Sequence, residues 1–475
     1  MNNLTLLLSF SCLLAGVFIF RKLWLGALVA VLIALASKLF FSPEVNSVYR
    51  ELSNAIIVWA ELILSIFGAY LFYYTLAYNK HFTPFTESVT SISSRISLVI
   101  ILCFFMGSFM EGIAGFGTPA LLIAPLMLVV GFKPLSAIAL PLSSSTTAVL
   151  FGALGIPLKI GLGINQPDEV VIKTIILNAL PTLFIPLVLG YLLSKTEKFK
   201  INWKKEWKAL VGAGIFFYIP FSITALFSIE FPSVVAGITG LLLFVFVFIP
   251  SNEKIPIRIW WITFSPYLFF IILLLIWKFV SQHTHFSLSP DLKNISLFQP
   301  GLVFIIASIA VMFFLDKKDF GIQLSTLLKD SLYKIHLPAI TILLLICFTQ
   351  LIAKSLSENI SSLTASINQS WQIVVQPVIG IIGSFITGSA TMSNLLFAGS
   401  LSGLTLTQQP LLTAMLHTGS AVGNAISLQN IIMVKSVVPE NISESRILKF
   451  NLLVVVLYVV LVVLSALIYM SCVNI

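Results

Sequence analysis

Apolar runs of about twenty residues recur along nearly the whole chain and are separated by short polar loops. Each run is long enough to cross a hydrocarbon layer of about 30 Å as a helix, and none has the short alternating pattern of a membrane β-barrel strand. Charged residues make up only 9% of the chain, whereas soluble globular proteins contain about 25%. The sequence therefore predicts an all-α polytopic membrane protein.

About twelve of these runs are predicted to be full transmembrane helices. Two further segments, residues 96–132 and 371–409, are too long for a single span and are interrupted by Gly, Pro, Ser and Asn. The first run is followed by Arg21 and Lys22 and not by a small-residue cleavage site, which predicts a retained span instead of a signal peptide. The predicted spans are residues 4–20, 24–41, 55–77, 134–160, 174–193, 208–229, 233–250, 259–281, 299–315, 336–353, 411–434 and 449–472.

The net charge of +9 lies mainly in the loops, where Lys and Arg determine membrane topology, so no nucleic-acid partner is predicted. The lysine-rich loop 195–208 is expected on the cytoplasmic side, and the acidic loop 165–169 on the outside. The other basic loops fall on the cytoplasmic side only if both interrupted segments are re-entrant hairpins. The first hairpin then opens to the cytoplasm and the second to the exterior, with both termini outside.

The two hairpins belong to an internal repeat. Placing residue 107 over residue 383 aligns GSFMEGIAGFGT with GSFITGSATMSN, and the same register pairs Ser144 with Ser420. Seven full spans separate the hairpins, so the copies face opposite ways across the membrane. The predicted organisation is two N-terminal spans (1–54), repeat one (55–193), middle helices (194–330) and repeat two (331–475).

Inverted-topology repeats with interrupted helices are typical of secondary transporters, whose substrate site lies near the membrane midplane. A turn at membrane depth leaves backbone groups unpaired, so it persists only where it is buried in protein or lines a water-filled cavity. Half-helices beginning near Gly117–Pro119 and near Ser393–Asn394 would direct free N–H groups inward, which favours an anion. The sequence therefore predicts a transporter.

Three segments carry a resemblance to a known family: EGIAGFGTPA at 111–120, FGALGIP at 151–157 and TGSATMSN at 387–394. They resemble the signature segments of the L-lactate permease family. The resemblance implies a bacterial inner-membrane proton symporter for lactate, glycolate and related short 2-hydroxy acids.

Glu111 is the only charged residue between Ile96 and Phe132 and is the first candidate for proton coupling, because an ionisable group inside the membrane marks a pathway by default. The alternative is a permanently protonated carboxyl group that stabilises the turn. His417 is the second candidate for proton coupling, or for binding the substrate carboxylate when charged. A neutral histidine with a structural role is the alternative.

Hydroxyl and amide groups at the turns are predicted to bind a small carboxylate substrate without burying a counter-charge. The alternative is that these small residues only pack helices or satisfy helix backbones. The predicted substrate-binding residues are Gly115, Gly117, Thr118, Ser144, Thr387, Ser389, Thr391, Ser393 and Asn394.

The resulting hypothesis is proton symport of a small monocarboxylate such as L-lactate or glycolate, with a sodium-coupled carboxylate transporter as the alternative. A passive channel would differ in lacking uphill accumulation. No enzyme activity, cofactor or metal is predicted, because the chain has no H-E-x-x-H or G-x-S-x-G motif and its four cysteines are isolated. The expected partners are substrate, protons and the lipid bilayer, and a homo-oligomer is compatible with the sequence.

Overall fold

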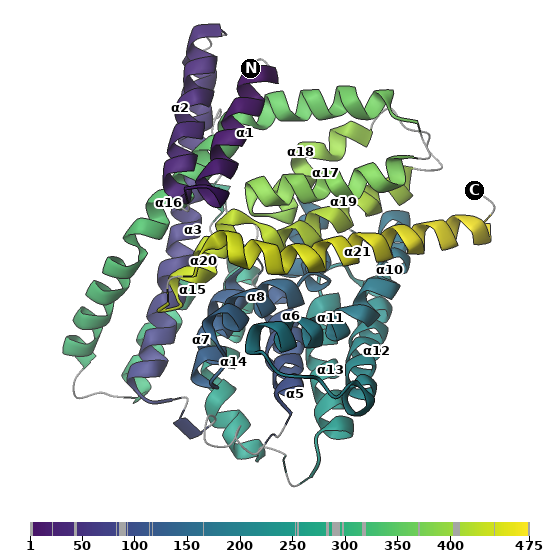
Figure 1. Ribbon diagram of the computed structural model, residues 1–475. Coiled ribbons are helices and arrows are strands. Elements are labelled where there is room, and N and C mark those ends of the chain that lie inside the picture. Colours follow the sequence, from purple (N-terminus) through teal and green to yellow (C-terminus); the bar gives the residue numbers. More distant parts are fainter. Residues whose placement is uncertain are drawn as a thin grey trace. The chain divides into compact units, whose positions relative to one another are not determined.

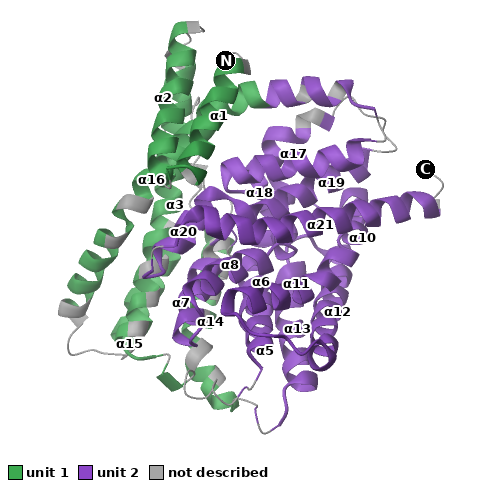
Figure 2. Ribbon diagram, viewed as in Figure 1, with its two compact units in different colours: residues 1–90, 255–356 green, residues 91–254, 357–475 purple. Residues whose placement is uncertain are grey.

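The computed structural model of the chain is almost entirely helical (Figure 1). It describes residues 3–473 except 21, 42–44, 82, 85–91, 93, 114, 116, 165, 252, 254–255, 282–284, 287–294, 297–298, 316–319, 369–370, 402–408 and 441. The chain forms two compact units, residues 1–90 with 255–356 and residues 91–254 with 357–475 (Figure 2). Each unit therefore combines segments from both halves of the sequence.

Unit 1 is built from long apolar helices that pack closely where glycines face each other. Helices α1 and α2 meet at Gly16 and Gly26, where a Cβ on either residue would lie 2.7 Å from the Cα of the other. The Trp59 indole donates a hydrogen bond to the Ala339 carbonyl at 2.8 Å, which joins α3 to α16. The helices are α1 (Asn3–Phe18), α2 (Leu23–Phe41), α3 (Val45–Tyr78), α14 (Ile257–Ser281), α15 (Pro300–Leu315) and α16 (Phe320–Ser366), and α16 extends into unit 2.

Three phenylalanine rings from α3, α14 and α15 pack together inside unit 1. The rings of Phe270 and Phe304 stack with centroids 3.9 Å apart, and the Phe72 ring lies 5.9 Å from both. The connection between α14 and α15 contains a short antiparallel pair, β1 (His285–Phe286) with β2 (Ile295–Ser296).

Unit 2 begins with a helix, a glycine-containing turn and a second helix. The first helix contains α5 (Arg95–Val99), a π-helical turn η1 (Ile100–Met106) and α6 (Gly107–Ile113), and it is followed by α7 (Thr118–Val129). The next segment is bent, with α8 (Pro134–Ser144), a 3₁₀ turn η2 (Ala148–Phe151) and α9 (Gly152–Lys159). Then come α10 (Glu169–Leu177), α11 (Ala179–Glu197), α12 (Trp203–Phe227) and α13 (Pro232–Phe248).

The remaining part of unit 2 contains the same kinds of element in the same order. Helix α17 (Gln372–Thr387), α18 (Ala390–Phe397) and the short η4 (Ala398–Leu401) form a second helix–turn–helix segment. They are followed by α19 (Gln409–Gly423), η5 (Asn424–Ile426), α20 (Leu428–Ser436) and the long α21 (Glu444–Val473).

Seven of the described helices are long and apolar enough to cross a membrane, or eight if the bent pair of α8 and α9 is one span. Every one of the twelve predicted spans coincides with at least one helix, but several of these helices are shorter or broken. Within the predicted spans 134–160 and 411–434, the helix is interrupted by a 3₁₀ turn.

Candidate functional site

The two predicted hairpin turns are helix–turn–helix segments whose turns depend on glycine. Gly115 and Gly117 have φ values of 60° and 73°, and Gly388 has a φ of 72°, a backbone conformation in which a Cβ is strained. Pro119 lies in the first turn of α7, where its missing N–H costs no hydrogen bond. Helix α18 begins at Ala390, so the predicted start at Ser393 was three residues late.

The first turn lies against both bent segments of unit 2. A Cβ on Gly115 would lie 2.6 Å from the Cβ of Ala153 in α9. A Cβ on Gly117 would lie 2.3 Å from Met433 Cε and 3.1 Å from Asn430 Oδ1, both in α20. Only a residue without a side chain permits this close approach, which explains two of the three glycines in EGIAGFGTPA.

Glu111 lies in α6, one turn before Gly115, and is only 3% exposed. Its carboxyl group faces the break in the first bent segment, where a Cβ on Gly152 would lie 3.1 Å from Glu111 Oε1. Helix α13 covers α6, because a Cβ on Gly112 would lie 2.7 Å from the backbone nitrogen of Val234. The structure therefore places a carboxyl group beside an interrupted helix, inside the protein and away from lipid.

The first bent segment has an unusual backbone. Helices α8 and the η2–α9 pair meet at an angle of 53°. Ala153, Leu154 and Gly155 have φ values of 48°, 57° and 79°, all in the left-handed region. A non-glycine residue in this region costs roughly 1–2 kcal/mol, and such strain concentrates at functional sites.

Carbonyl groups in the first bend and in the last turn of α9 are satisfied by side chains from distant segments. Ser233 donates to the Ala148 carbonyl at 2.7 Å, and His417 Nε2 donates to the Leu150 carbonyl at 3.0 Å. Asn394 Nδ2 donates to the Pro157 carbonyl at 3.1 Å. Buried backbone groups must be paired where a helix is broken, and these hydrogen bonds satisfy that requirement.

His417 is fully buried and joins the second helix–turn–helix segment to the first bend. Its Nε2 donates to Leu150, so its Nδ1 is the acceptor for the Asn394 amide at 2.9 Å. One donating and one accepting nitrogen is the hydrogen-bond pattern of a neutral imidazole. Both ring nitrogens of His417 are therefore bonded to groups of the protein in this structure.

The side chains of several other predicted substrate-binding residues already make hydrogen bonds within the protein. Ser144 donates to the Cys103 carbonyl at 2.8 Å, and Ser393 donates to the Gly380 carbonyl at 2.8 Å. Thr387 Oγ1 donates to the Ser389 carbonyl at 3.0 Å, and Ser389 Oγ caps α18 by accepting from Met392 N. Thr391 is buried, and the side chain of Thr118 lies outside the described residues.

Asn394 has one polar atom left over. Its Nδ2 makes two hydrogen bonds, whereas its Oδ1 is buried with no partner among the described residues. Asn424 Oδ1 in η5 and Ser143 Oγ at the end of α8 are also buried with no partner among the described residues. Unpaired buried polar atoms are costly, and they occur where a ligand or ion can complete the bonding.

A polar network around Asn178 and Tyr458 was not found from the sequence. Tyr458 OH donates to Asn178 Oδ1 at 2.8 Å and is 3.0 Å from Thr147 Oγ1, and Asn178 Nδ2 donates to Thr418 Oγ1 at 2.9 Å. The network connects the first bend with α19, next to His417. A lone Asn and Tyr inside otherwise apolar runs were the available signal, but only the fold brings them together.

Gln429 and Asn430 in α20 are a second pair of residues that the sequence analysis missed. Gln429 Nε2 donates to the Ile386 carbonyl at 3.4 Å, and a Cβ on Gly388 would lie 2.5 Å from Gln429 Oε1. Asn430 lies against Gly117 of the first turn. Helix α20 therefore contacts both turns, which brings the two halves of the candidate site together.

The fold and the site define a polytopic helical membrane protein with two glycine-dependent turns and two interrupted helices that meet around buried polar side chains. The model of the L-lactate permease family matches residues 11–260 and 259–473. The chain belongs to this family, and the protein is accordingly a multi-pass membrane transporter.

Individual relatives agree with the family. The glycolate permease of Escherichia coli is 27% identical over 484 residues, covering 86% of this chain and 84% of the relative. The L-lactate permease of Bacillus subtilis is 25% identical over 496 residues, covering 88% and 84%. The structure of the Alcanivorax borkumensis YdaH transporter covers 91% of this chain at 14% identity, with a TM-score of 0.33, which is too low to support an inference about this chain.

Proposed function

We propose that this protein is a proton symporter of a small monocarboxylate, such as L-lactate or glycolate, in the bacterial inner membrane. The observation that carries the proposal is the buried Glu111 carboxyl group, which lies between a helix–turn–helix segment and an interrupted helix. Relatives named as lactate and glycolate permeases support the substrate class. An intramembrane carboxyl group in such a place is a proton carrier by default.

The proposed architecture is an inverted-topology repeat with two re-entrant hairpins. Helix α9 begins at Gly152 and α20 at Leu428, the same separation of 276 residues that aligns Gly107 with Gly383. The order helix–turn–helix, bent segment and long helix also occurs twice. With twelve spans, the first hairpin opens to the cytoplasm, the second opens to the exterior and both termini lie outside.

In the proposed cycle, the substrate carboxylate binds between the two turns, where N–H groups at the start of α7 and α18 favour an anion. Hydroxyl and amide groups such as Thr391 and Asn394 hold the carboxylate and the 2-hydroxyl group. A proton on Glu111 neutralises the charge of the loaded site, so a neutral complex crosses the membrane. Equal numbers of protons and anions make the cycle electroneutral.

His417 has a different role in this proposal from that of Glu111. Because its hydrogen bonds are those of a neutral imidazole, we assign it to holding Asn394 against the first bend. Glu111 is then the one proton-coupling group of the cycle. Ser144 and Ser393, which are bonded to backbone carbonyls, maintain helix packing beside the substrate.

Sodium coupling is the second candidate, because the buried oxygen atoms without a partner among the described residues include Asn394 Oδ1, Asn424 Oδ1 and Ser143 Oγ. Interrupted helices of transporters coordinate sodium with oxygen atoms of this kind. Replacing sodium with choline in the transport buffer distinguishes the two coupling ions.

The experiment that tests the proposal uses purified protein in liposomes, an acid-outside pH gradient, no sodium and a clamped voltage. We expect labelled L-lactate or glycolate to accumulate above equilibrium, and collapse of the pH gradient with an ionophore to abolish accumulation. Accumulation that requires sodium and ignores the pH gradient would overturn proton coupling. Saturation of uptake with substrate concentration separates a carrier from a passive channel.

A further inference from the structure

The connection between α11 and α12 and the adjoining helix ends form a cavity that is open to the surface and that the transport site does not use. Its volume is about 520 Å³, within the range of small-molecule sites. Most of its lining residues are of two kinds, the lysines Lys195, Lys198 and Lys200 and the aromatic residues Tyr191, Phe199 and Trp203, with Ser194 and Ile201 completing the wall. This combination matches an anion that is attached to an apolar body.

The positive charge of the cavity is not compensated by the acidic residues nearby in the sequence. Glu197 is turned away: its carboxylate accepts hydrogen bonds from Arg95 at 3.1 Å and from the Lys133 backbone at 2.8 Å, and its side chain is 4% exposed. Glu206 accepts from Ser94 at 3.3 Å. Among the described residues, no carboxylate pairs with the three cavity lysines.

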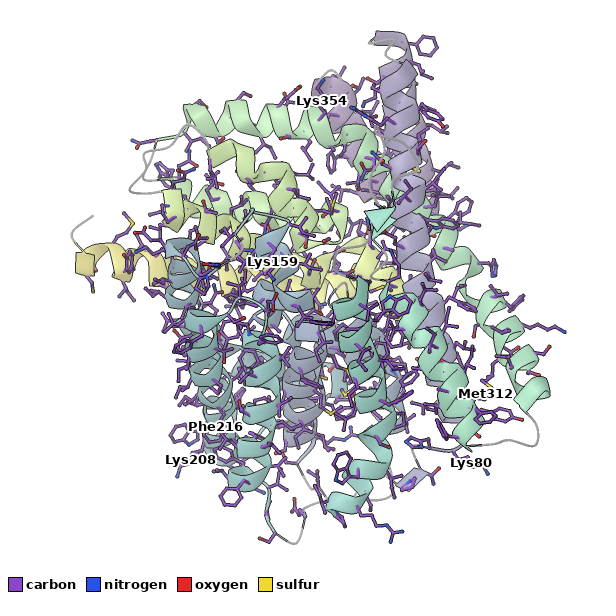
Figure 3. All side chains as sticks on the ribbon, turned by 180° about the vertical axis from the view of Figure 1, so that it is seen from behind. Lys80, Lys159, Lys208, Phe216, Met312 and Lys354 are labelled. Atoms are coloured by element: carbon purple, nitrogen blue, oxygen red, sulfur yellow. The ribbon has the colours of Figure 1, made fainter. Side chains whose placement is uncertain are left out.

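The side chains around the cavity also favour a lipid as its ligand. Tyr191 and Trp203 are 40% and 43% exposed, and such aromatic side chains belong at the membrane–water interface. Farther along the two helices, Phe184 of α11 and Ile219 of α12 are exposed apolar side chains on which acyl chains can lie. Figure 3 shows Lys208 near the beginning of α12 and Phe216 farther along the same helix, which illustrates the change from basic to apolar side chains.

We propose that this cavity binds the phosphate headgroup of an anionic phospholipid, with the three lysines around the phosphate and the lipid tails along α11 and α12. Basic pockets beside the cytoplasmic ends of membrane helices recognise such headgroups. In the proposed topology this lysine-rich loop lies on the cytoplasmic side, where anionic lipids contact it. The site is independent of the transported solute.

The test compares two triple variants of the full-length protein that remove equal charge. Lys195→Gln/Lys198→Gln/Lys200→Gln neutralises the cavity, and Lys204→Gln/Lys205→Gln/Lys208→Gln neutralises lysines at the start of α12 that do not line it. Native mass spectrometry of the detergent-solubilised protein follows the binding of phosphatidylglycerol, phosphatidylcholine and inorganic phosphate. The cavity variant should bind phosphatidylglycerol about 100-fold more weakly than the natural protein, since each basic group near an anionic headgroup contributes about fivefold, and the control variant should bind nearly normally.

Three outcomes would overturn the proposal: equal losses in both triple variants, no preference for phosphatidylglycerol over phosphatidylcholine, or complete displacement of the lipid by inorganic phosphate at similar affinity. The last outcome would assign the cavity to a soluble phosphate compound. Size-exclusion chromatography checks that each variant is folded. If the triple cavity variant fails to fold, the single Lys198→Gln variant should still weaken phosphatidylglycerol binding about fivefold, and unchanged binding would also reject the site.

Discussion

The two bent segments of unit 2 have the same succession of helix, 3₁₀ turn and helix but stabilise their breaks differently. The second break is largely satisfied by neighbours in its own half, since Asn430 donates to the Asn424 carbonyl and Asn451 donates to the Ala425 carbonyl. Ser427 caps the following helix by accepting from Asn430 N. The first break relies on a left-handed backbone and on distant side chains.

This difference means that the first break cannot keep its geometry without the second half of the sequence. Its carbonyls at Leu150 and Pro157 accept from His417 and Asn394, which lie about 240 to 270 residues farther along the chain. In the part of the chain that the structure describes, the second break has no hydrogen bond of this kind to the first half. A change in the position of α18 or α19 therefore acts directly on the first break, which is a physical route for coupling the two halves.

A second difference concerns charge. Glu111 stands one turn before the first glycine turn, and the 276-residue register places Thr387 at the equivalent position of the second. Thr387 donates to the Ser389 carbonyl within its own turn. One half thus carries the ionisable group and the other half carries neutral hydrogen-bonding groups. In our proposal, the first half binds the proton and the second half contributes most of the substrate contacts.

The largest expected effect comes from removing this charge difference. Glu111→Gln keeps the size of the side chain but cannot exchange a proton, so pH-driven accumulation should be abolished while exchange of labelled for unlabelled substrate continues. Uptake into proteoliposomes with and without a pH gradient measures both activities. Glu61→Gln in unit 1 is the control, since Glu61 accepts a hydrogen bond from Gln299 and lies outside the proposed site. Retained pH-driven accumulation in Glu111→Gln would refute the assignment.

The two turns should differ in their tolerance of a methyl group. Gly115→Ala adds a Cβ 2.6 Å from Ala153, which belongs to a constrained left-handed segment, so the variant should lose folded protein or transport. Gly388→Ala adds a Cβ 2.5 Å from Gln429 Oε1, which can rotate away, and 2.9 Å from Gln429 Cβ, which requires a small shift of α20. Both variants carry the roughly 1–2 kcal/mol cost of a left-handed alanine. The difference in stability between them therefore measures the cost of the contact between the added Cβ and its neighbouring residue.

Thermal unfolding in detergent and initial uptake rates measure this difference. We expect a lower melting temperature for Gly115→Ala than for Gly388→Ala, with substantial transport remaining only in the latter. Equal loss in both variants would show that the first turn is no more constrained than the second.

A smaller effect is expected for the hydrogen bonds that cross between the halves. Asn394→Leu leaves the Pro157 carbonyl and His417 Nδ1 without their donor, and each unpaired buried group costs about 1–3 kcal/mol. Asn430→Leu removes one longer bond, at 3.3 Å, within the second break. Asn394→Leu should therefore lower the free energy of unfolding more and raise the KM for substrate. A larger loss in Asn430→Leu would contradict the dependence of the first break on the second half.

Much of the helical arrangement was accessible from the sequence, and the reason is physical. Apolar length identifies helices in a membrane, and glycines next to a buried charge identified the first turn, where Gly115 and Gly117 have left-handed backbones. Helix breaks inside predicted spans were missed, because Ser, Thr and Pro are tolerated within membrane helices. Their presence in a span therefore does not indicate that the helix is interrupted. Ser143 to Thr147 and the Gly-Asn pair at 423–424 were the local signals.

The binding partners of buried polar residues were the least predictable part of the site. The contact of His417 with Leu150 depends on a fold that brings together residues far apart in sequence, and so does the network of Asn178 with Tyr458. The sequence identified His417 as exceptional but left its role open between a charged and a neutral imidazole. Only the positions of its two hydrogen-bond partners distinguish those states.

The smallest effects should come from two ion pairs at the ends of the bent segments. Lys159 ends α9 and pairs with Glu230, and Lys435 near the end of α20 pairs with Glu444 at 2.6 Å. The side chains of the first pair are 28% and 34% exposed, and those of the second pair are 19% and 14% exposed.

Neutralising these lysines tests whether the ion pair at the end of the second bent segment is more stabilising than the ion pair at the end of the first. Because exposed pairs contribute about 0–1 kcal/mol, Lys159→Gln should change the free energy of unfolding by a few tenths of a kcal/mol at most, and Lys435→Gln by somewhat more. Thermal unfolding of both variants at low and high salt measures the two effects, and the effect of Lys159→Gln should disappear first as salt rises, because its pair is the more exposed. A larger, salt-insensitive loss in Lys159→Gln would indicate that Lys159 instead helps to hold the strained first bend, through the loop containing Ile229, whose carbonyl lies against Gly155.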